Sequence, residues 1–247
     1  MSVKDYLRRS RAPRYSLVFA LPLLLLYEVL SAALSGSAVA GVRNGADVLL
    51  KTLFLGLGGR GGLYLFGVLL VGGGSWLVWR DRRAAGEKYE PRVFAWMALE
   101  SGAYAAVFGG VVGWLTTLVL SGPRTLSAGG VAALDLPTQL VISLGAGLYE
   151  ELVFRVLLVG LLLRLFGVLL PAGRKTGTAL AVVVSALVFS SFHYIGPLGD
   201  AFALPSFTFR AIAGVVFSVL FVARGFGIAA WTHALYDLGL SVMQAGS

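Results

Sequence analysis

The amino-acid sequence predicts an all-α integral membrane protein built as a bundle of about seven transmembrane helices. Of its 247 residues, 57% are hydrophobic and only 13% are charged, and the mean hydropathy is +0.84. Typical soluble domains are about half apolar and about a quarter charged. A bilayer core of about 30 Å needs roughly 20 mostly apolar residues per helix, and several such runs follow one another here. We therefore expect residues 1–247 to form a single integral membrane domain.

Seven apolar runs mark the expected spans, and a shorter run lies between the first two. The short run, Val48–Leu57, cannot cross a membrane alone and is followed by glycines, so we expect it to be interfacial or re-entrant. If it crosses, the count becomes eight, and the sequence allows six to eight spans in all. The seven expected spans lie near residues 16–35, 63–79, 93–120, 137–165, 178–193, 206–223 and 227–243.

The first expected span could instead belong to a cleaved signal peptide. Basic residues precede it, and Ala38-Val39-Ala40 resembles a signal-peptidase site. The apolar stretch from Ser16 to Ser35 is longer than the roughly 7 to 15 residues of a signal-peptide core, which favours a retained helix.

The positive charges fit a membrane topology. Seven spans and a cytoplasmic N-terminus put most Lys and Arg residues in inner connections, as the positive-inside rule requires, and the C-terminus outside. We expect an integral protein of the plasma (inner) membrane of a bacterium. The net charge of +8 is spread over these connections and predicts no nucleic-acid partner, and the absence of cysteine excludes disulfides and thiolate chemistry. The basic residues of the inner connections are Arg80, Arg82, Arg83, Lys88, Arg92, Arg164, Arg174, Lys175 and Arg224. Those of the outer connections are Arg43, Lys51, Arg60 and Arg124.

Ionisable residues within the spans are the candidate functional residues, because each costs about 2.5 to 3.5 kcal/mol on insertion scales. We expect Glu28 and Glu100 to be polar partners between helices, although either could instead neutralise Arg155 or Arg210. The whole set is Glu28, Glu100, Glu150, Glu151, Arg155, His193, Arg210, His233 and Asp237.

The pattern Glu150-Glu151-x-x-x-Arg155 lies in the middle of the fourth expected span. On an α-helical wheel Glu151 and Arg155 project about 40° apart, whereas Glu150 lies about 140° from Arg155. Arg155 therefore pairs most naturally with Glu151, which leaves Glu150 facing a cavity or another helix, where it could exchange protons with a bound water. An ordinary ion pair plus one carboxylate bonded to a neighbouring helix is the structural alternative.

Two further patterns contain the only two histidines of the chain. Phe189-x-x-x-His193 ends the fifth span, and His233-x-x-x-Asp237 lies in the last, each with its two residues on one helical face. Taken singly, His193 could be a satisfied packing residue and His233–Asp237 an ordinary hydrogen bond or half of a metal site. Together with Glu150, two imidazoles within a bilayer suffice for hydrolysis: the carboxylate activates water, one imidazole assists proton transfer and the other holds the oxyanion.

The three patterns, in this order, resemble those of the CPBP (ABI) family of membrane proteases, which includes the CAAX proteases, bacteriocin-processing enzymes and Ras-converting endopeptidases. The resemblance covers about 140–240, and we expect the catalytic core to lie at about 137–243. It implies that Glu150, His193 and His233 surround a catalytic water, supported by Glu151, Arg155 and Phe189. The CAAX endopeptidases carry Asn at the last motif position, where this chain has Asp237. Because an ionised Asp would repel an oxyanion, Asp237 must be protonated, orient His233, or mark a different substrate class. We count Asp237 among the catalytic residues, as the group that tunes His233.

The family has been described both as metalloproteases and as glutamic peptidases. Glu150, His193 and His233 could bind Zn²⁺, but there is no His-Glu-x-x-His helix, and we favour a mechanism without cofactor or metal. In our topology His193 lies near the outer end of its span and His233 nearer the inner end of its own, although a shared site requires a common depth.

We therefore expect an intramembrane endopeptidase whose partners are the bilayer and a membrane-associated or lipid-modified protein or peptide. The oligomeric state and the substrate are not indicated. A prenylated C-terminus, a bacteriocin-like leader and a regulatory membrane protein all remain open. Alternative functions are a non-catalytic immunity or partner-stabilising protein on the same scaffold, a proton-coupled transporter, and bis-histidine haem ligation.

Overall fold

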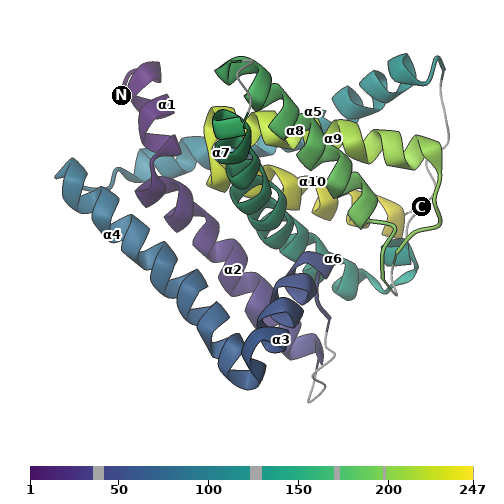
Figure 1. Cartoon of the computed structure of the whole chain (residues 1–247), viewed down its shortest axis with the longest axis horizontal. Helices are drawn as coiled ribbons and strands as arrows, with labels where there is room; N and C mark the ends of the chain where they lie inside the picture. The colour runs from purple at the N-terminus through teal and green to yellow at the C-terminus, as the bar shows by residue number, and fades with distance from the viewer. Residues whose placement is uncertain (36–41, 123–129, 170–172, 197–198, 247) are drawn as a thin grey trace.

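The computed structural model describes residues 1–35, 42–122, 130–169, 173–196 and 199–246, and this part of the chain is helical, without a β-strand. The Ala38-Val39-Ala40 motif and Arg124 lie outside the described residues. The elements, labelled as in Figure 1, are α1 (Val3–Arg11), α2 (Pro13–Ser35), α3 (Gly45–Gly67), η1 (Val68–Gly72), α4 (Gly73–Ala85), α5 (Pro91–Val119), η2 (Gly130–Ala133), α6 (Leu136–Gly145), η3 (Ala146–Val159), α7 (Gly160–Leu169), α8 (Arg174–Phe192), α9 (Leu204–Arg224) and α10 (Phe226–Ala245).

Each of the seven expected spans coincides with a helix or a continuous set of helices. Five of them are long and apolar enough to cross a membrane on their own: Pro13–Leu34, Gly45–Ala85, Pro91–Val119, Lys175–Phe192 and Leu204–Arg224. The other two expected spans are α6–η3–α7 and α10, which carry the Glu-Glu and His-Asp patterns. The prediction of a polytopic helical bundle is confirmed.

The segment Val48–Leu57 does not continue straight into the next span. The chain turns at Gly58 and Gly59, and Gly59 has φ +55°, a conformation that glycine adopts readily. The rings of Phe54 and Phe66 lie 5.3 Å apart, although twelve residues of straight helix would extend about 18 Å. The first part of α3 therefore folds back along the helix that follows it, instead of adding a straight span of its own.

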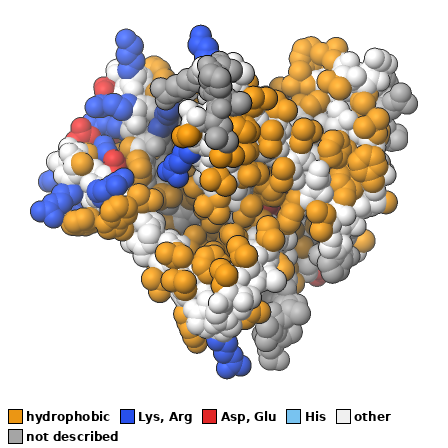
Figure 2. Space-filling model, viewed as in Figure 1, with side chains coloured by type: hydrophobic (Ala, Val, Ile, Leu, Met, Phe, Trp, Pro, Cys, Tyr) orange, Lys and Arg blue, Asp and Glu red, His pale blue; other side chains and the backbone are white. Residues whose placement is uncertain are grey.

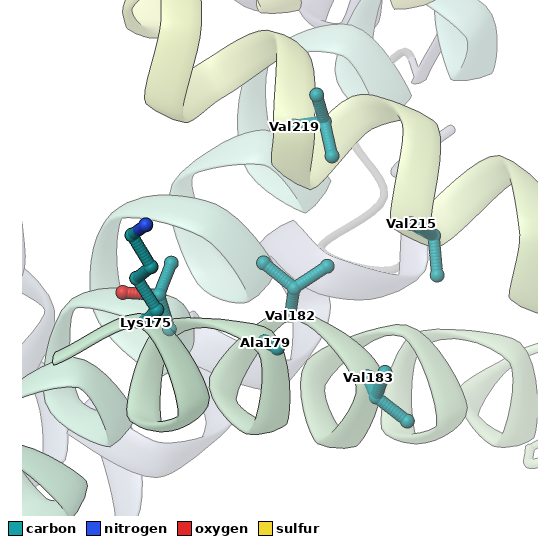
Figure 3. A pocket seen from close by; sticks show the side chains of 7 residues that line it. Lys175, Ala179, Val182, Val183, Val215 and Val219 are labelled. Atoms are coloured by element: carbon teal, nitrogen blue, oxygen red, sulfur yellow. The ribbon is translucent and has the colours of Figure 1, made fainter. Parts of the chain in front are cut away.

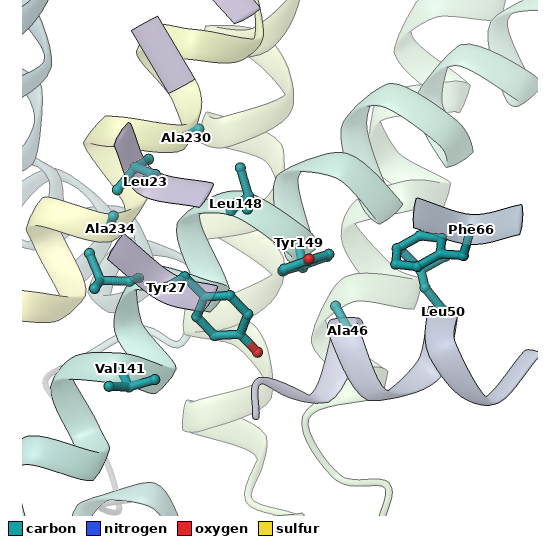
Figure 4. Packing of buried hydrophobic residues seen from close by; sticks show 11 residues of the cluster. Leu23, Tyr27, Ala46, Leu50, Phe66, Val141, Leu148, Tyr149, Ala230 and Ala234 are labelled. Carbon is teal, nitrogen blue, oxygen red and sulfur yellow. The ribbon is translucent and has the colours of Figure 1, made fainter. Parts of the chain in front are cut away.

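Helix α10 lies against α2, α5, α6, η3 and α9, and so brings the two halves of the chain together. Its contact with η3 is so close that it requires glycine at position 147: a Cβ there would lie 2.4 Å from the carbonyl oxygen of Ala230. The adjoining apolar cluster also includes Tyr27 of α2 and Tyr149 of η3, which point towards the start of α3 (Figure 4). This packing fixes the α3 start, η3 and α10 relative to one another.

An ion pair and a hydrogen bond bring the N-terminus, the α4–α5 connection and the end of α9 to one end of the bundle. Arg9 pairs with Glu90 at 2.5 Å, and the Arg224 side chain donates to Ser10 at 2.9 Å. Figure 2 shows Lys and Arg side chains gathered where α1 and the end of α4 lie, whereas hydrophobic side chains cover much of the remaining visible face. Such an apolar outer surface is expected of helices that face lipid.

Candidate active site

The Glu-Glu-x-x-x-Arg pattern lies on η3, which is a π-helix and not the α-helix that the sequence analysis assumed. Its i→i+5 hydrogen bonds widen each turn, so residues five apart lie closer to one face than an α-helical wheel indicates. The predicted pairing of Glu151 with Arg155 is found, with a carboxylate oxygen 3.2 Å from a guanidinium nitrogen. Both side chains are fully buried, and the Arg155 guanidinium also lies over the ring of Phe189, 4.3 Å from its centroid.

Glu150 projects towards both histidines. One carboxylate oxygen, Oε2, lies 4.0 Å from His193 Nε2 and 3.9 Å from His233 Nε2, and it has no hydrogen-bond partner among the described residues. The other oxygen, Oε1, accepts a hydrogen bond from Asn44 Nδ2 at 2.9 Å. The residue is 6% exposed. The arrangement leaves one oxygen fixed and the other facing two imidazole nitrogens.

His193 follows the last residue of α8 and turns its ring inwards. Its Nδ1 lies 2.9 Å from the carbonyl oxygen of Phe189, which can only accept, so Nδ1 carries the proton. In the neutral ring the lone pair of Nε2 then faces Glu150. The spacing in Phe189-x-x-x-His193 thus serves two contacts: the i–4 carbonyl orients the imidazole, and the Phe189 ring meets it edge-on at 4.8 Å.

His233 is held on the other side of Glu150. Its Nδ1 donates to Glu151 Oε1 at 2.8 Å, and its ring stacks on Phe217 with centroids 4.3 Å apart. Asp237 instead lies 3.5 Å from Nε2. Glu151 thus binds Nδ1, while the i+4 position places Asp237 on the same ring edge as Glu150.

The two histidines share a depth, contrary to the concern raised by the predicted span ends. His193 lies at the end of α8, whereas His233 lies well inside α10. Both nevertheless reach within 4.0 Å of the same Glu150 oxygen. Sequence distance from a span end is thus a poor measure of depth when helices differ in length and inclination.

The remaining candidate residues lie in separate ion pairs. Glu28 of α2 binds Arg43 at 2.7 Å, and Glu100 of α5 binds Arg224 at 2.6 Å. Both are partners between segments, as expected, and neither pairs with Arg155 or Arg210. Arg210 itself pairs with Asp200.

Sequence reasoning missed Asn44, which caps α3 and contacts Glu150. An Asn directly before an apolar run is an N-cap signal, so the start of a helix could have been predicted there. Its contact with Glu150 could not, because 106 residues separate the two in the chain.

The spacing of Glu150, His193 and His233 is wider than that of a tetrahedral zinc site. Zn–N and Zn–O bonds of about 2.0 to 2.1 Å place neighbouring ligand atoms about 3.3 Å apart. Here the carboxylate oxygen lies 3.9 and 4.0 Å from the imidazole nitrogens, and no set of three or more His, Cys, Asp or Glu residues in the described part of the chain has metal-site spacing. The side chains as placed do not fit zinc without moving.

An apolar surface groove lies apart from these residues. It runs between α8 and α9 and is lined by Val182, Val183, Val215 and Val219, with Lys175 nearby (Figure 3). It contains no carboxylate or imidazole and is open on its outer side, as expected of lipid-facing surface. We therefore place the candidate site at the Glu150–His193–His233 cluster.

One comparison with known proteins matches the region of the chain that contains these residues. A family model described as type II CAAX prenyl endopeptidase Rce1-like matches residues 132–239. Neither a curated protein nor a solved structure matches the chain. The matched region includes the Glu-Glu-x-x-x-Arg, Phe-x-x-x-His and His-x-x-x-Asp patterns and excludes Asn44. The chain is thus an integral membrane protein whose residues 132–239 are similar to the Rce1-like CAAX proteases, and this similarity supports an intramembrane endopeptidase in general.

Proposed function

We propose that the protein hydrolyses a peptide bond of a membrane-associated substrate with Glu150 as general base. The observation that carries this proposal is the Oε2 atom of Glu150, which is buried, unpartnered among the described residues, and about equally distant from two imidazole nitrogens. Groups separated by about 4 Å are too far apart for a direct hydrogen bond, but one water can bridge them.

The contacts suggest a separate role for each group. Oε2 takes a proton from the water, and the resulting hydroxide attacks the scissile carbonyl carbon. His193, neutral with its proton on Nδ1, accepts a hydrogen bond at Nε2 from the O–H that the water retains, and so orients the attack. The glutamic acid then gives its proton to the leaving amine, so that the water is divided between the two products.

His233 is suited to hold the oxyanion as an imidazolium. A positively charged ring has N–H groups on both sides, and Glu151 accepts from Nδ1 at 2.8 Å, which leaves Nε2–H for the developing oxyanion. Arg155, buried beside Glu151, keeps that carboxylate in place. Asp237 lies on the Nε2 side of the His233 ring, where its carboxyl group influences the charge on that ring.

We propose a metal-free reaction in the inner membrane of a bacterium, in one integral domain with its catalytic core at about 137–243. We assign the end of the bundle that carries α1 to the cytoplasm because its basic residues satisfy the positive-inside rule. A prenylated C-terminus, a bacteriocin-like leader or a regulatory membrane protein could be the substrate.

The test is cleavage by purified protein in lipid nanodiscs, using a peptide library of membrane-protein termini, with and without chelator. We expect Glu150→Gln, His193→Ala and His233→Ala to lose cleavage while chelator has no effect. Glu100→Gln is the matched control, because it also neutralises a partly buried glutamate but lies in a separate ion pair; it should retain cleavage.

The alternatives predict different results. Undiminished cleavage by Glu150→Gln would refute Glu150 as the base. If the wild type cleaves nothing and Glu150→Gln still supports the cellular phenotype, the protein is a non-catalytic member of the family. A substrate-dependent proton flux without cleavage would identify a transporter, and inhibition by chelator would point to a metal.

A further inference from the structure

A residue outside the matched domain contacts the proposed base. Asn44, the only asparagine of the chain, is 3% exposed and donates from Nδ2 to Glu150 Oε1 at 2.9 Å. The family model begins at residue 132, so this contact reaches the site from a different part of the chain.

The orientation of the Asn44 amide is determined by its other contacts. Oδ1 accepts from the backbone N–H of Ala46 at 2.8 Å, as an N-cap does. The backbone N–H of Asn44 donates to the Tyr27 hydroxyl at 3.0 Å. Because Oδ1 must be the acceptor for Ala46, the NH₂ group is the one that faces Glu150.

A group of four paired charges anchors the start of α3. Tyr27 donates to Asp47 at 2.8 Å, and Tyr149, the neighbour of Glu150, donates to Glu28 at 2.8 Å. The carboxylates of Glu28 and Asp47 each bind both Arg43 and Lys51, at distances from 2.7 to 3.4 Å. This paired cluster consists of Glu28, Arg43, Asp47 and Lys51.

A glycine permits Asn44 to approach the helix that carries Glu150. A Cβ at Gly145 would lie 2.6 Å from Asn44 Cβ and 2.5 Å from a ring carbon of Tyr27. Such distances are shorter than van der Waals contact, so a larger residue would push these side chains away.

We propose that Asn44 is a positioning residue that decides which oxygen of Glu150 acts as the base. Its amide engages Oε1 and so directs Oε2 towards His193 and His233. The proposal rests on the proposed function of Glu150. It implies that the N-terminal half of the chain completes a site whose motifs all lie in the C-terminal half.

The test separates the two roles of the Asn44 side chain, which caps α3 through Oδ1 and donates to Glu150 through Nδ2. Asp and Ser cap helices about as well as Asn, so Asn44→Asp and Asn44→Ser keep the start of α3 but remove the N–H directed at Glu150. We expect kcat in the nanodisc assay to fall about 100-fold in both, with KM within about threefold, because Asn44 does not touch the substrate in this proposal. A residue that serves only as a cap would give wild-type kcat in both.

Infrared difference spectroscopy gives a second readout that needs no substrate. The carbonyl stretch of protonated Glu150 is identified by its loss in Glu150→Gln, and Asn44→Ser should move it to higher wavenumber because a hydrogen bond to the carbonyl is lost. The control is Gln139→Ser, which also replaces a buried amide by a hydroxyl group, here an amide that donates to the Leu134 carbonyl. It should leave both kcat and the Glu150 band unchanged.

The outcomes are distinguishable. If Glu150→Gln is inactive but both Asn44 variants cleave at the wild-type rate, the inference fails and the proposed function stands. An unmoved Glu150 band in Asn44→Ser also overturns the inference, even if no substrate is found. If Glu150→Gln cleaves normally, the proposed function fails and the inference fails with it.

Discussion

Two neighbouring groups of charged residues differ in how completely they are paired. In the paired cluster, two carboxylates and two cations balance each other, with ion pairs of 2.7 to 3.4 Å. The second group, which we term the open cluster, has three carboxylates, one guanidinium and two imidazoles. Its members are Glu150, Glu151, Arg155, His193, His233 and Asp237.

The open cluster leaves buried polar atoms without hydrogen bonds. Among the described residues these are Glu150 Oε2, Glu151 Oε2 and the three guanidinium nitrogens of Arg155, one of which is ion-paired with Glu151. The paired cluster has one such atom, Asp47 Oδ1, and it lies 2.8 Å from Lys51 Nζ. An unsatisfied buried polar group costs about 1 to 3 kcal/mol, so a cluster that retains several is a candidate for chemistry. The comparison teaches that a buried glutamate is a poor indicator of function until the pairing of its oxygens is known.

Apart from the three variants expected to lose cleavage, the largest effect on activity is expected from Glu151→Gln in the open cluster. The substitution removes the anionic acceptor of His233 Nδ1–H and the partner of Arg155. By analogy with carboxylates that orient a catalytic histidine, kcat should fall about 10²- to 10⁴-fold. The nanodisc assay measures this, with Glu100→Gln as control. A loss below threefold would show that Glu151 is only structural.

In the paired cluster the largest effect should fall on stability. Asp47 is fully buried and binds both Arg43 and Lys51, so Asp47→Asn leaves two cations with one carboxylate. Removing one member of a buried ion pair costs about 3 to 5 kcal/mol, to be measured as the free energy of unfolding in detergent. The exposed Asp5→Asn variant is the control and should unfold like the wild type. Equal stability of both variants would remove the distinction between the clusters.

Gly145→Ala tests how the two clusters are joined. The added methyl group would overlap Tyr27 and Asn44, which should cost about 1 to 3 kcal/mol of unfolding free energy and lower kcat by displacing Asn44. Gly102→Ala is the matched control, because a Cβ there meets nothing within 4 Å; it should be neutral or stabilise by about 0.5 to 1 kcal/mol. Equal melting temperatures and rates for the two variants would contradict this account.

The smallest effect is expected from Asp237→Asn. Asp237 lies 3.5 Å from His233 Nε2, its side chain is 28% exposed, and Glu151 already orients the ring. We expect kcat/KM to stay within about tenfold of the wild type, which corresponds to about 1.4 kcal/mol. Steady-state cleavage of a peptide found in the library measures it. A loss above about 100-fold would support the sequence-based assignment of Asp237 to the catalytic group.

Much of the fold could be predicted because span length and hydrophobicity are properties of single segments. The ranges 16–35 and 206–223 fall inside α2 and α9 for this reason. The i+4 pairing of Glu151 with Arg155 was likewise a local property that survived the change from α- to π-helical winding. By contrast, the sequence assigned Arg43 and Lys51 only to an outer connection. Their ion pairs with Glu28 of α2 and Asp47 at the start of α3 depend on how these segments pack.

The sequence by itself determined that the chain is a membrane bundle and which few ionisable residues its spans contain, because burying charge in lipid is costly wherever it occurs. Three motifs in order were enough to indicate the family. Only the tertiary structure decided that Glu151 rather than Asp237 holds His233 Nδ1, and that Asn44 holds Glu150. These contacts join segments 82 and 106 residues apart, and they depend on where packing brings the helices together, which no local pattern encodes.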